Sequence, residues 1–163
     1  MAKNKEEKTN VMRVLEQKKI AYTPHSYPHE EGIAVDGVTV AQSMGFDPAI
    51  VFKTLVARGA SKQYYVFDVP VTENLDLKKA AKAVGEKSIE MIHQKELLPL
   101  TGYVHGGCSP VGMKKLFPTV IDASAENLET MIVSAGKIGY QVELAPRDLA
   151  ALVRAKFADI IVE

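Results

Sequence analysis

Tryptophan is absent from this sequence, cysteine occurs once, and there is no run of about 18 apolar residues. The single cysteine, Cys108, excludes an internal disulfide framework and a zinc site built from several cysteines, and it agrees with a reducing compartment. The lack of a long apolar run excludes a membrane-spanning helix. The lysine-rich start of the chain lacks the apolar segment of a secretory signal. We therefore expect a cytoplasmic protein without a membrane partner.

Neither sign of charge is in excess, because 20 Lys and Arg balance 20 Asp and Glu. This excludes a protein that holds nucleic acid by bulk positive charge, so any contact with nucleic acid must be local. Hydrophobic residues make up 47% and charged residues 25% of the chain, which is typical of a folded globular domain and not of a disordered or fibrous chain. The length of 163 residues predicts a single domain over residues 1–163.

The order of the helix and strand patterns predicts a mixed α/β fold with hairpins, without the regular βαβ alternation of a doubly wound sheet. The strongest signals are strands at Ile50–Ala57 and Tyr64–Val71, which predict an antiparallel hairpin. Thr39 is expected to cap the second helix, and Pro99 to close the fourth. Shorter strands are expected over Ile20–Tyr27, Tyr103–His105, Thr119–Asp122, Met131–Ser134 and Tyr140–Glu143, and helices over Lys5–Lys19, Val40–Met44, Asn74–Val84, His93–Leu98 and Pro146–Ala155.

A lysine interrupts the apolar face of the first hairpin strand. The period of two places Lys53 on the same face as Val51 and Leu55. Such a lysine can protect a strand edge from aggregation or keep its charged end in water. It can also project into a pocket, where it would bind an anion or a carbonyl oxygen, or act as a base if burial lowers its pKa. The pattern alone leaves both interpretations open.

Two loops rich in small residues offer backbone N–H groups. The segment Gly106–Gly112 holds three glycines and a proline, and Ser134–Gly139 is a second such loop. Loops of this kind suit an oxyanion or a phosphate, although either could be an ordinary tight connection. Cys108 and Ser109 are candidate nucleophiles with His105 nearby, but the G-x-S-x-G elbow is missing because position 111 is Val.

Neither a metal nor a cofactor is indicated, because the four histidines form no metal-binding pattern. Two groups of lysines could contact an RNA backbone or could simply be solvated. The first comprises Lys78, Lys79 and Lys82 on one helix, and the second is the pair Lys114-Lys115.

Three segments together carry a family resemblance: Val51–Val56, Gly106–Gly112, and Ser134–Gly139 followed by Glu143–Leu149. In their order and spacing the chain resembles the YbaK/EbsC proteins from about Val11 to the C-terminus. These are Cys-tRNA(Pro) deacylases related to the editing domain of bacterial prolyl-tRNA synthetase. The resemblance implies an α/β fold with a curved, mixed and largely antiparallel β-sheet surrounded by helices. It also implies hydrolysis of the ester that joins a wrong amino acid to the terminal ribose of tRNA.

The resemblance assigns roles to individual residues. It implies that Lys53 is the essential lysine, and that the backbone of the G-x-x-x-P loop lies against the aminoacyl group and stabilises the oxyanion. One position departs from the family, since Gln141 stands where an acidic residue that contacts the substrate amino group is often found. The implied catalytic group is Lys53, Gly106, Gly107, Cys108 and Ser109, and the implied substrate-binding group is Tyr27, Thr54, Pro110, Ser134, Gly136 and Gln141.

In the family the nucleophile is the thiol of the substrate and not a protein cysteine, and the amino acid leaves as a cyclic thiolactone. The implied partners are the acceptor end of tRNA(Pro) and, transiently, prolyl-tRNA synthetase. Two alternatives share the same motifs. The chain could remove alanine or another small amino acid with the help of water, or it could be a binding or regulatory module without hydrolysis.

Overall fold

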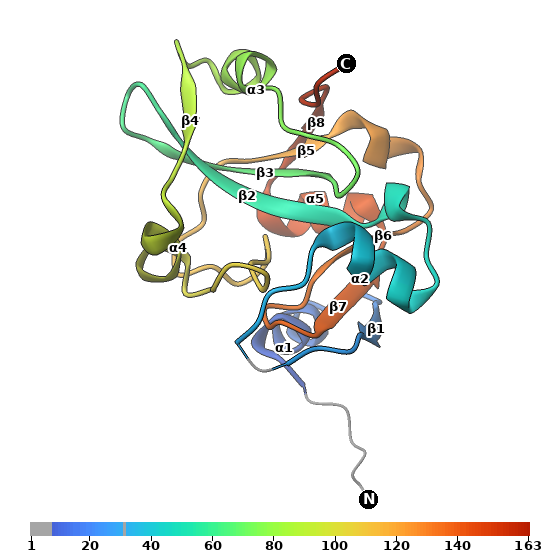
Figure 1. The fold of residues 1–163 in the computed structure, drawn as a ribbon. Helices are drawn as coiled ribbons and strands as arrows, with labels where there is room; N and C mark the ends of the chain where they lie inside the picture. Colours follow the sequence, from blue (N-terminus) through green and yellow to red (C-terminus); the bar gives the residue numbers. More distant parts are fainter. Residues whose placement is uncertain (1–7, 31) are drawn as a thin grey trace, which may run out of the picture.

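The computed structural model describes residues 8–30 and 32–163, and its strands hydrogen-bond as two sheets (Figure 1). The smaller sheet is antiparallel and has the order β1-β7-β6, made of β1 (Thr23–Ser26), β7 (Tyr140–Leu144) and β6 (Met131–Ser134). The larger sheet has the order β4-β2-β3-β5-β8, made of β4 (Ile89–Met91), β2 (Phe52–Gly59), β3 (Tyr64–Pro70), β5 (Thr119–Asp122) and β8 (Lys156–Ala158). A parallel bridge between Val51 and Ile132 links the two sheets.

The expected hairpin is confirmed, because β2 and β3 pair in antiparallel register with Lys53 opposite Val69 and Thr54 opposite Asp68. β5 pairs with β3, and β8 with β5, in parallel, so the larger sheet is mixed. The predicted fold class, an α/β fold with a mixed β-sheet surrounded by helices, is therefore confirmed. The structure refines it, since the strands divide between two linked sheets.

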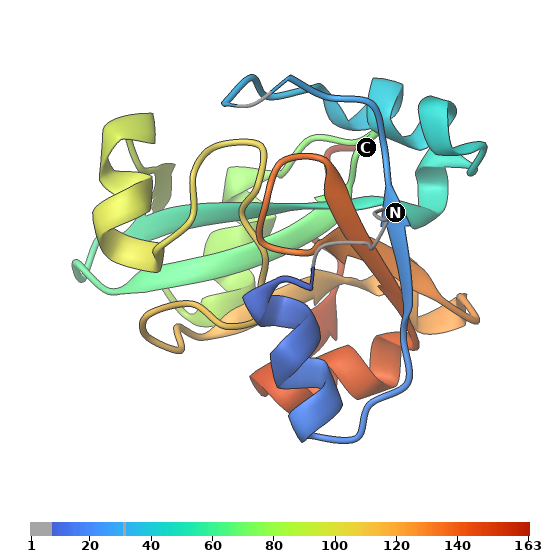
Figure 2. The same cartoon turned by 90° about the horizontal axis from the view of Figure 1, so that it is seen from below.

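Helices cover both faces of the larger sheet (Figures 1 and 2). Helix α3 packs on one face, and α1 and α5 pack on the other. Among the described residues, no helix is both long and apolar enough to span a bilayer. The helices are α1 (Asn10–Gln17), α2 (Gly37–Met44), α3 (Leu77–Val84), α4 (Gln94–Thr101) and α5 (Pro146–Val153), with short 3₁₀ turns at Pro48–Ile50 and Ala123–Asn127.

Strand alternation divides the apolar side chains of the hairpin between two cores. Phe52, Val56 and Val66 join α1, α5 and the smaller sheet in the main core. Tyr65 and Phe67 point to the opposite face, where they pack against α3. Because β3 lies between β2 and β5 and both of its faces are covered, nearly all of its residues are buried.

Several local predictions were wrong, each for a local reason. Asp36 caps α2 in place of Thr39, whose backbone N–H and hydroxyl both donate to the Asp36 carboxylate. Pro99 lies inside α4, which continues to Gly102, whose left-handed backbone ends the helix. No strand forms at Tyr103–His105, because the Tyr103 N–H donates to the Thr101 hydroxyl and the next residues turn.

The ends of other elements differ more modestly. Helix α1 begins at Asn10 with Thr9 as its cap, and the expected helical start at residues 5–7 lies outside the described residues. Two short strands, β4 and β8, were not predicted. Each has only three residues, too few to show a period of two in the sequence.

Candidate functional site

A pocket of about 300 Å³ opens between the start of β2, the loop after α4 and the smaller sheet. It brings together residues that lie far apart in the sequence. Of the residues assigned by resemblance, its lining contains Tyr27, Lys53, Thr54, Gly106, Cys108, Ser134 and Gln141. The assigned residues outside the lining are Gly107, Ser109, Pro110 and Gly136.

The pocket lies along an open edge of β2. β4 pairs only with the last three residues of this strand, so the earlier part has β3 on one side and the pocket on the other. The Val71 N–H donates to the Val51 carbonyl, and the Gly59 N–H donates to the Gln63 carbonyl, both at 2.8 Å, so the odd-numbered residues of β2 bond to β3. The backbone N–H and carbonyl of Thr54 therefore point toward the open edge.

Lys53 and Thr54 project from opposite faces of β2, and the pocket reaches both because it wraps around this edge. The Lys53 side chain is partly buried, and desolvation lowers the pKa of its ammonium, while the charge of Glu73 acts in the opposite direction. Among the described residues, Lys53 forms no ion pair. A partly dehydrated cation that is not held in such an ion pair is suited to bind an anionic or carbonyl oxygen of a ligand.

Thr54 connects the pocket to a buried acid that the sequence analysis missed. Its hydroxyl donates to Oδ1 of Asp68 at 2.6 Å, across the β2–β3 pair. Asp68 is completely buried, and burial raises the pKa of its carboxyl to about 7, while the Thr54 hydrogen bond opposes this shift. In the sequence its signal was one acidic residue within the apolar segment Tyr64–Val71.

The G-x-x-x-P loop forms one wall of the pocket. Gly106 has a φ of +91°, and a Cβ there would lie 2.7 Å from the Ala34 Cβ, so glycine is required. The Gly107 N–H donates to the Val104 carbonyl at 3.0 Å, which closes a turn and withdraws this donor from the pocket. Gly106 and Cys108 line the pocket, so their N–H groups are the candidate oxyanion donors of this loop.

Cys108 and Ser109 have the surroundings of structural residues and not of nucleophiles. Burial and the nearby Asp68 carboxyl raise the pKa of the Cys108 thiol to about 12, so the thiol stays protonated at neutral pH. Ser109 is fully buried, and its Oγ accepts the Val111 N–H at 3.2 Å. The Tyr103 hydroxyl donates to the Val111 carbonyl at 2.5 Å and thereby holds the end of the loop in place.

The smaller sheet supplies the facing wall. Ser134 and Gln141 are cross-strand partners on β6 and β7, and both line the pocket. The Ser134 Oγ accepts the Gly136 N–H at 3.0 Å, which shapes the second loop. Gln141 is buried, and its Oε1 is a buried acceptor without a hydrogen-bond partner among the described residues. Gly136 lines a second cavity of about 420 Å³ beside Tyr140.

The two loops lie side by side (Figure 2). A Cβ on Gly107 would lie 3.0 Å from the Ile138 nitrogen, which shows how closely their backbones approach. Tyr27 closes the same region, since its N–H donates to the Gly139 carbonyl at 3.0 Å and its ring is buried in the lining. Burial raises the pKa of the Tyr27 hydroxyl.

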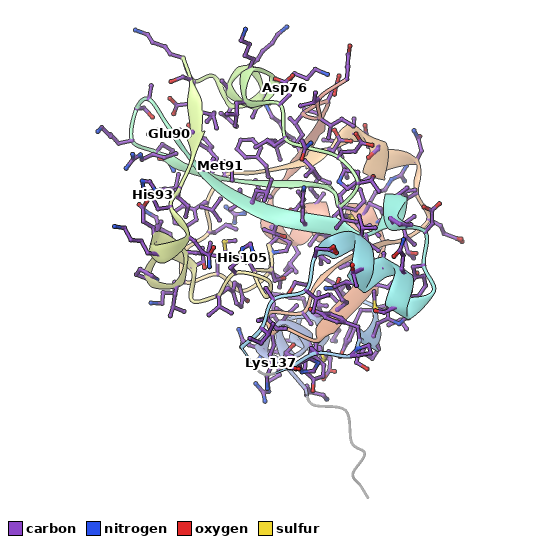
Figure 3. All side chains as sticks on the ribbon, viewed as in Figure 1. Asp76, Glu90, Met91, His93, His105 and Lys137 are labelled. Carbon is purple, nitrogen blue, oxygen red and sulfur yellow. The ribbon has the colours of Figure 1, made fainter. Side chains whose placement is uncertain are left out.

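The pocket also contains residues that the sequence analysis did not propose as ligand contacts. Asp36 and Gly37 contribute from the start of α2, Leu97 from α4, and His105 from the loop after α4. His105 is exposed, and Figure 3 places it below β2, on the same side of β2 as Lys137. In the sequence, these residues were marked only by lying near predicted helix caps and loops. Such a position does not show which side chains come together in one pocket.

The predicted basic groups lie apart from the pocket. Lys79 of α3 forms ion pairs with Asp159 at 3.0 Å and Glu163 at 3.2 Å, so its charge is compensated within the chain. Lys114 and Lys115 lie beside α4, around a different surface hollow. Among the described residues, no three His, Cys, Asp or Glu side chains gather as a metal site.

The fold and the pocket together define a class of protein: a small α/β domain with a pocket that is lined by a lysine and by residues of two loops rich in small side chains. The comparisons with known proteins identify the family. Residues 34–152 match the model of the aminoacyl-tRNA editing domain. The chain belongs to the aminoacyl-tRNA editing domain family.

Relatives agree with this assignment. The chain is 45% identical over 161 residues to an Enterococcus faecalis protein named "Putative Cys-tRNA(Pro)/Cys-tRNA(Cys) deacylase EbsC", with 98% of each chain covered. It is 28% identical over 100 residues to a proline–tRNA ligase of Shouchella clausii, a match that covers 61% of this chain and 17% of the ligase. A crystal structure described as a putative trans-editing enzyme for prolyl-tRNA synthetase superposes with a TM-score of 0.80 at 26% identity, covering 94% of this chain and 95% of the other.

Proposed function

We propose that this chain is a trans-editing deacylase that cleaves the aminoacyl ester of Cys-tRNA(Pro), and also of Cys-tRNA(Cys), with the thiol of the substrate as the nucleophile. The observation that carries the proposal is a pocket with oxyanion donors and a lysine in which the one cysteine, Cys108, is held as a protonated thiol. With this thiol protonated, we assign the attack on the ester to the thiol of the substrate. The 45% identity to the Enterococcus faecalis protein named as such a deacylase supports the choice of cysteine.

We assign each residue a role according to its position in the pocket. The N–H groups of Gly106 and Cys108 stabilise the developing oxyanion, and Lys53 holds the phosphate or ribose of the terminal nucleotide and thereby orients the ester. Gln141 Oε1 accepts a hydrogen bond from the substrate ammonium, in place of the acidic residue that the family often has there. Tyr27, Thr54 and Ser134 complete the walls around the amino acid, while Gly107, Ser109, Pro110 and Gly136 keep the loops in shape.

Selectivity follows from the requirement for a thiol. A missing methylene changes binding by only about 10–200-fold, so pocket size alone would reject alanine weakly. An attacking group that only cysteine carries provides much stronger discrimination, since serine and alanine lack it. A water-dependent deacylase for alanine or another small amino acid is the second candidate, because the same walls would accept a smaller side chain.

The balanced charge of the chain suggests how it meets tRNA. With 20 basic and 20 acidic residues, non-specific affinity for a phosphate backbone is weak, so the chain reads mainly the acceptor end. We propose that prolyl-tRNA synthetase is a transient partner that passes the misacylated end to this chain. The likeness to part of a proline–tRNA ligase supports this pairing. We also propose that residues 1–163 act as one editing domain.

The test uses a substrate in which a methyl group replaces the proton on the sulfur of cysteine. tRNA(Pro) is charged with cysteine, and a second sample is alkylated to S-methylcysteinyl-tRNA(Pro). The proposal expects rapid loss of cysteine as a thiolactone and almost no loss of S-methylcysteine. Equal loss of both esters, with free amino acid as the product, would establish the water-dependent reaction instead.

A further inference from the structure

Asp68 is a buried acid directly behind the wall of the pocket. It lies on β3, the strand between β2 and β5, and it is 0% exposed. Its Oδ1 accepts the Thr54 hydroxyl at 2.6 Å, whereas its Oδ2 has no hydrogen-bond partner among the described residues. A fully buried carboxyl with an unpartnered oxygen is costly and rare, so its place beside a ligand pocket calls for an explanation.

Thr54 is the only hydrogen-bonded contact between Asp68 and the pocket lining among the described residues. A threonine hydroxyl has one hydrogen and two lone pairs. When that hydrogen is donated to an ionised Asp68, the Thr54 oxygen can act toward a ligand only as an acceptor. When Asp68 is protonated, it can donate to Thr54, and the hydroxyl hydrogen is then free to point into the pocket. The charge of Asp68 thus determines what Thr54 offers to a substrate.

In the described part of the chain, no Lys, Arg or His forms an ion pair with Asp68. The β2 neighbour on its face is Thr54, and the β5 neighbour is the apolar Ile121. The loop after α4 brings two titratable groups to this face, the Cys108 thiol and the Tyr103 hydroxyl, and burial raises the pKa of each to about 12. Both are therefore neutral near pH 7, while burial brings the pKa of Asp68 itself to about 7.

We propose that Asp68 is a positioning residue of the deacylation, which in its ionised form turns the Thr54 hydroxyl oxygen into the acceptor for the S–H of the substrate cysteine. The proposal rests on the proposed function, because it needs a substrate with a thiol. It adds to that function a residue that senses pH and acts through Thr54.

The substrate S–H gives its proton to Thr54 Oγ1 as the proton of Thr54 passes to Asp68 Oδ1. The sulfur electron pair forms the bond to the carbonyl carbon, and the ester C–O bond breaks with its electron pair on the ribose oxygen. That oxygen takes a proton from solvent and Asp68 returns one to solvent. The products are the cyclic thioester and uncharged tRNA, and no water or external reagent is consumed.

The test compares the rates of the wild type and a variant on the same substrate at each pH. Ionisation of the substrate affects both rates equally and therefore cancels in their ratio. Single-turnover rates on Cys-tRNA(Pro) are measured for the wild type and for Asp68→Asn from about pH 5.5 to about pH 8.5, after subtraction of the rate without enzyme. The proposal expects the ratio of wild type to variant to rise by up to about tenfold per pH unit below pH 7 and to level off above it. A ratio that stays constant with pH, or that falls as pH rises, would overturn the proposal.

Two further variants make the result specific. Asp122→Asn is the matched control, since Asp122 is a buried acid on the adjacent strand β5 that accepts the Ile160 N–H and lines no part of the pocket. Its ratio to the wild type should not change with pH. Thr54→Val removes the hydrogen bond to Asp68 and leaves Asp68 in place. The ratio of wild-type to Thr54→Val rates should therefore change with pH as it does for Asp68→Asn, and this variant serves if Asp68→Asn folds poorly. Thr54→Ser keeps a hydroxyl and should restore the wild-type pH profile. A wild-type profile for Thr54→Val would refute the relay.

Failure of the inference differs from failure of the proposed function. If the wild type does not deacylate Cys-tRNA(Pro) at any pH, the proposed function is wrong. If the wild type is active and all ratios are flat, only the role of Asp68 is wrong, and the carboxyl is a structural group.

Discussion

The α-carbon of Gly107 lies against the backbone of Ile138, so close that a Cβ on Gly107 would stand 3.0 Å from the Ile138 nitrogen. This contact joins the two loops beside the pocket, although the residues are 31 positions apart in the sequence (138 minus 107). A side chain at position 107 would require one of the two backbones to shift by a few tenths of an ångström. The spacing between the two loops therefore depends on the glycine at position 107.

Gly107→Ala should accordingly damage the site more than the fold. The added methyl pushes the loops apart, which costs roughly 1–3 kcal/mol of stability and displaces the donors of Gly106 and Cys108. Deacylation should fall at least tenfold, measured as single-turnover rates beside urea unfolding. Gly85→Ala is the control, because φ is +75° there with open space around it at the end of α3. It should lose similar stability and keep its activity, and a parallel loss of activity would contradict the argument.

Lys53→Met should abolish deacylation while the protein stays folded. Methionine keeps most of the length and apolar contact of the side chain and removes the charge. Loss of a single charge-stabilising donor at such a site costs roughly 3–4 kcal/mol, or about a hundred- to thousand-fold in rate. Circular dichroism and the melting temperature serve as the control for folding. A folded variant with wild-type turnover would remove Lys53 from the mechanism.

The charge of Lys53 also predicts an alkaline limit. Because desolvation lowers the pKa of this ammonium, its positive charge is lost at a lower pH than that of an exposed lysine. If the cation is the active form, the background-corrected rate falls as pH rises through this lowered pKa. This fall in rate at alkaline pH should be absent from the residual activity of Lys53→Arg, since arginine stays charged. If the rate of Lys53→Arg falls over the same pH range, the fall is caused by another group.

Cys108→Ala should retain deacylation within a few fold. A buried thiol whose pKa is about 12 is a poor nucleophile, so its loss removes packing and no chemistry. The substitution leaves a small cavity in the main core and should cost roughly 0.5–3 kcal/mol of stability. Activity is measured at a temperature well below the melting point of the variant. Near-complete loss of activity there would restore the thiol as a covalent nucleophile.

Asp68 should make stability depend on pH in an unusual direction. The unfolded chain loses the Asp68 proton near pH 4, whereas the folded chain holds it to about pH 7, so between these values the folded state binds more protons. Stability therefore falls as pH rises through this window, by up to about 1.4 kcal/mol per pH unit. Asp68→Asn lacks this term and should gain stability relative to the wild type from pH 5 to pH 7 in urea titrations. Parallel curves for the two proteins would show that Asp68 has an ordinary pKa.

Much of the fold was visible in the sequence, because its signals are local. The hairpin followed from two β-rich segments around a turn, and the expected ends of α2 at Met44 and of α3 at Val84 are confirmed. Pro99 was misread as a helix end, since the competing signal of Gly102 lies outside the predicted helix.

The site was predictable only in part, for a related reason. The resemblance indicated both loops and Lys53, but which of their groups face the pocket depends on long-range packing. The Gly107 N–H is engaged within its own turn, and Ser109 is buried behind the wall. Asp68 was missed because its partner Thr54 is set by the register of two strands, and a sequence pattern does not show which face of a central strand meets a pocket.

The most direct test of the whole account compares the deacylation rates of tRNA(Pro) charged with cysteine, serine and alanine, using the purified protein under identical conditions. The proposed function predicts fast loss of cysteine, released as a thiolactone, with serine and alanine lost no faster than in buffer. Loss of alanine at a rate comparable to that of cysteine would contradict the requirement for a substrate thiol, and stability of all three esters would contradict deacylation itself.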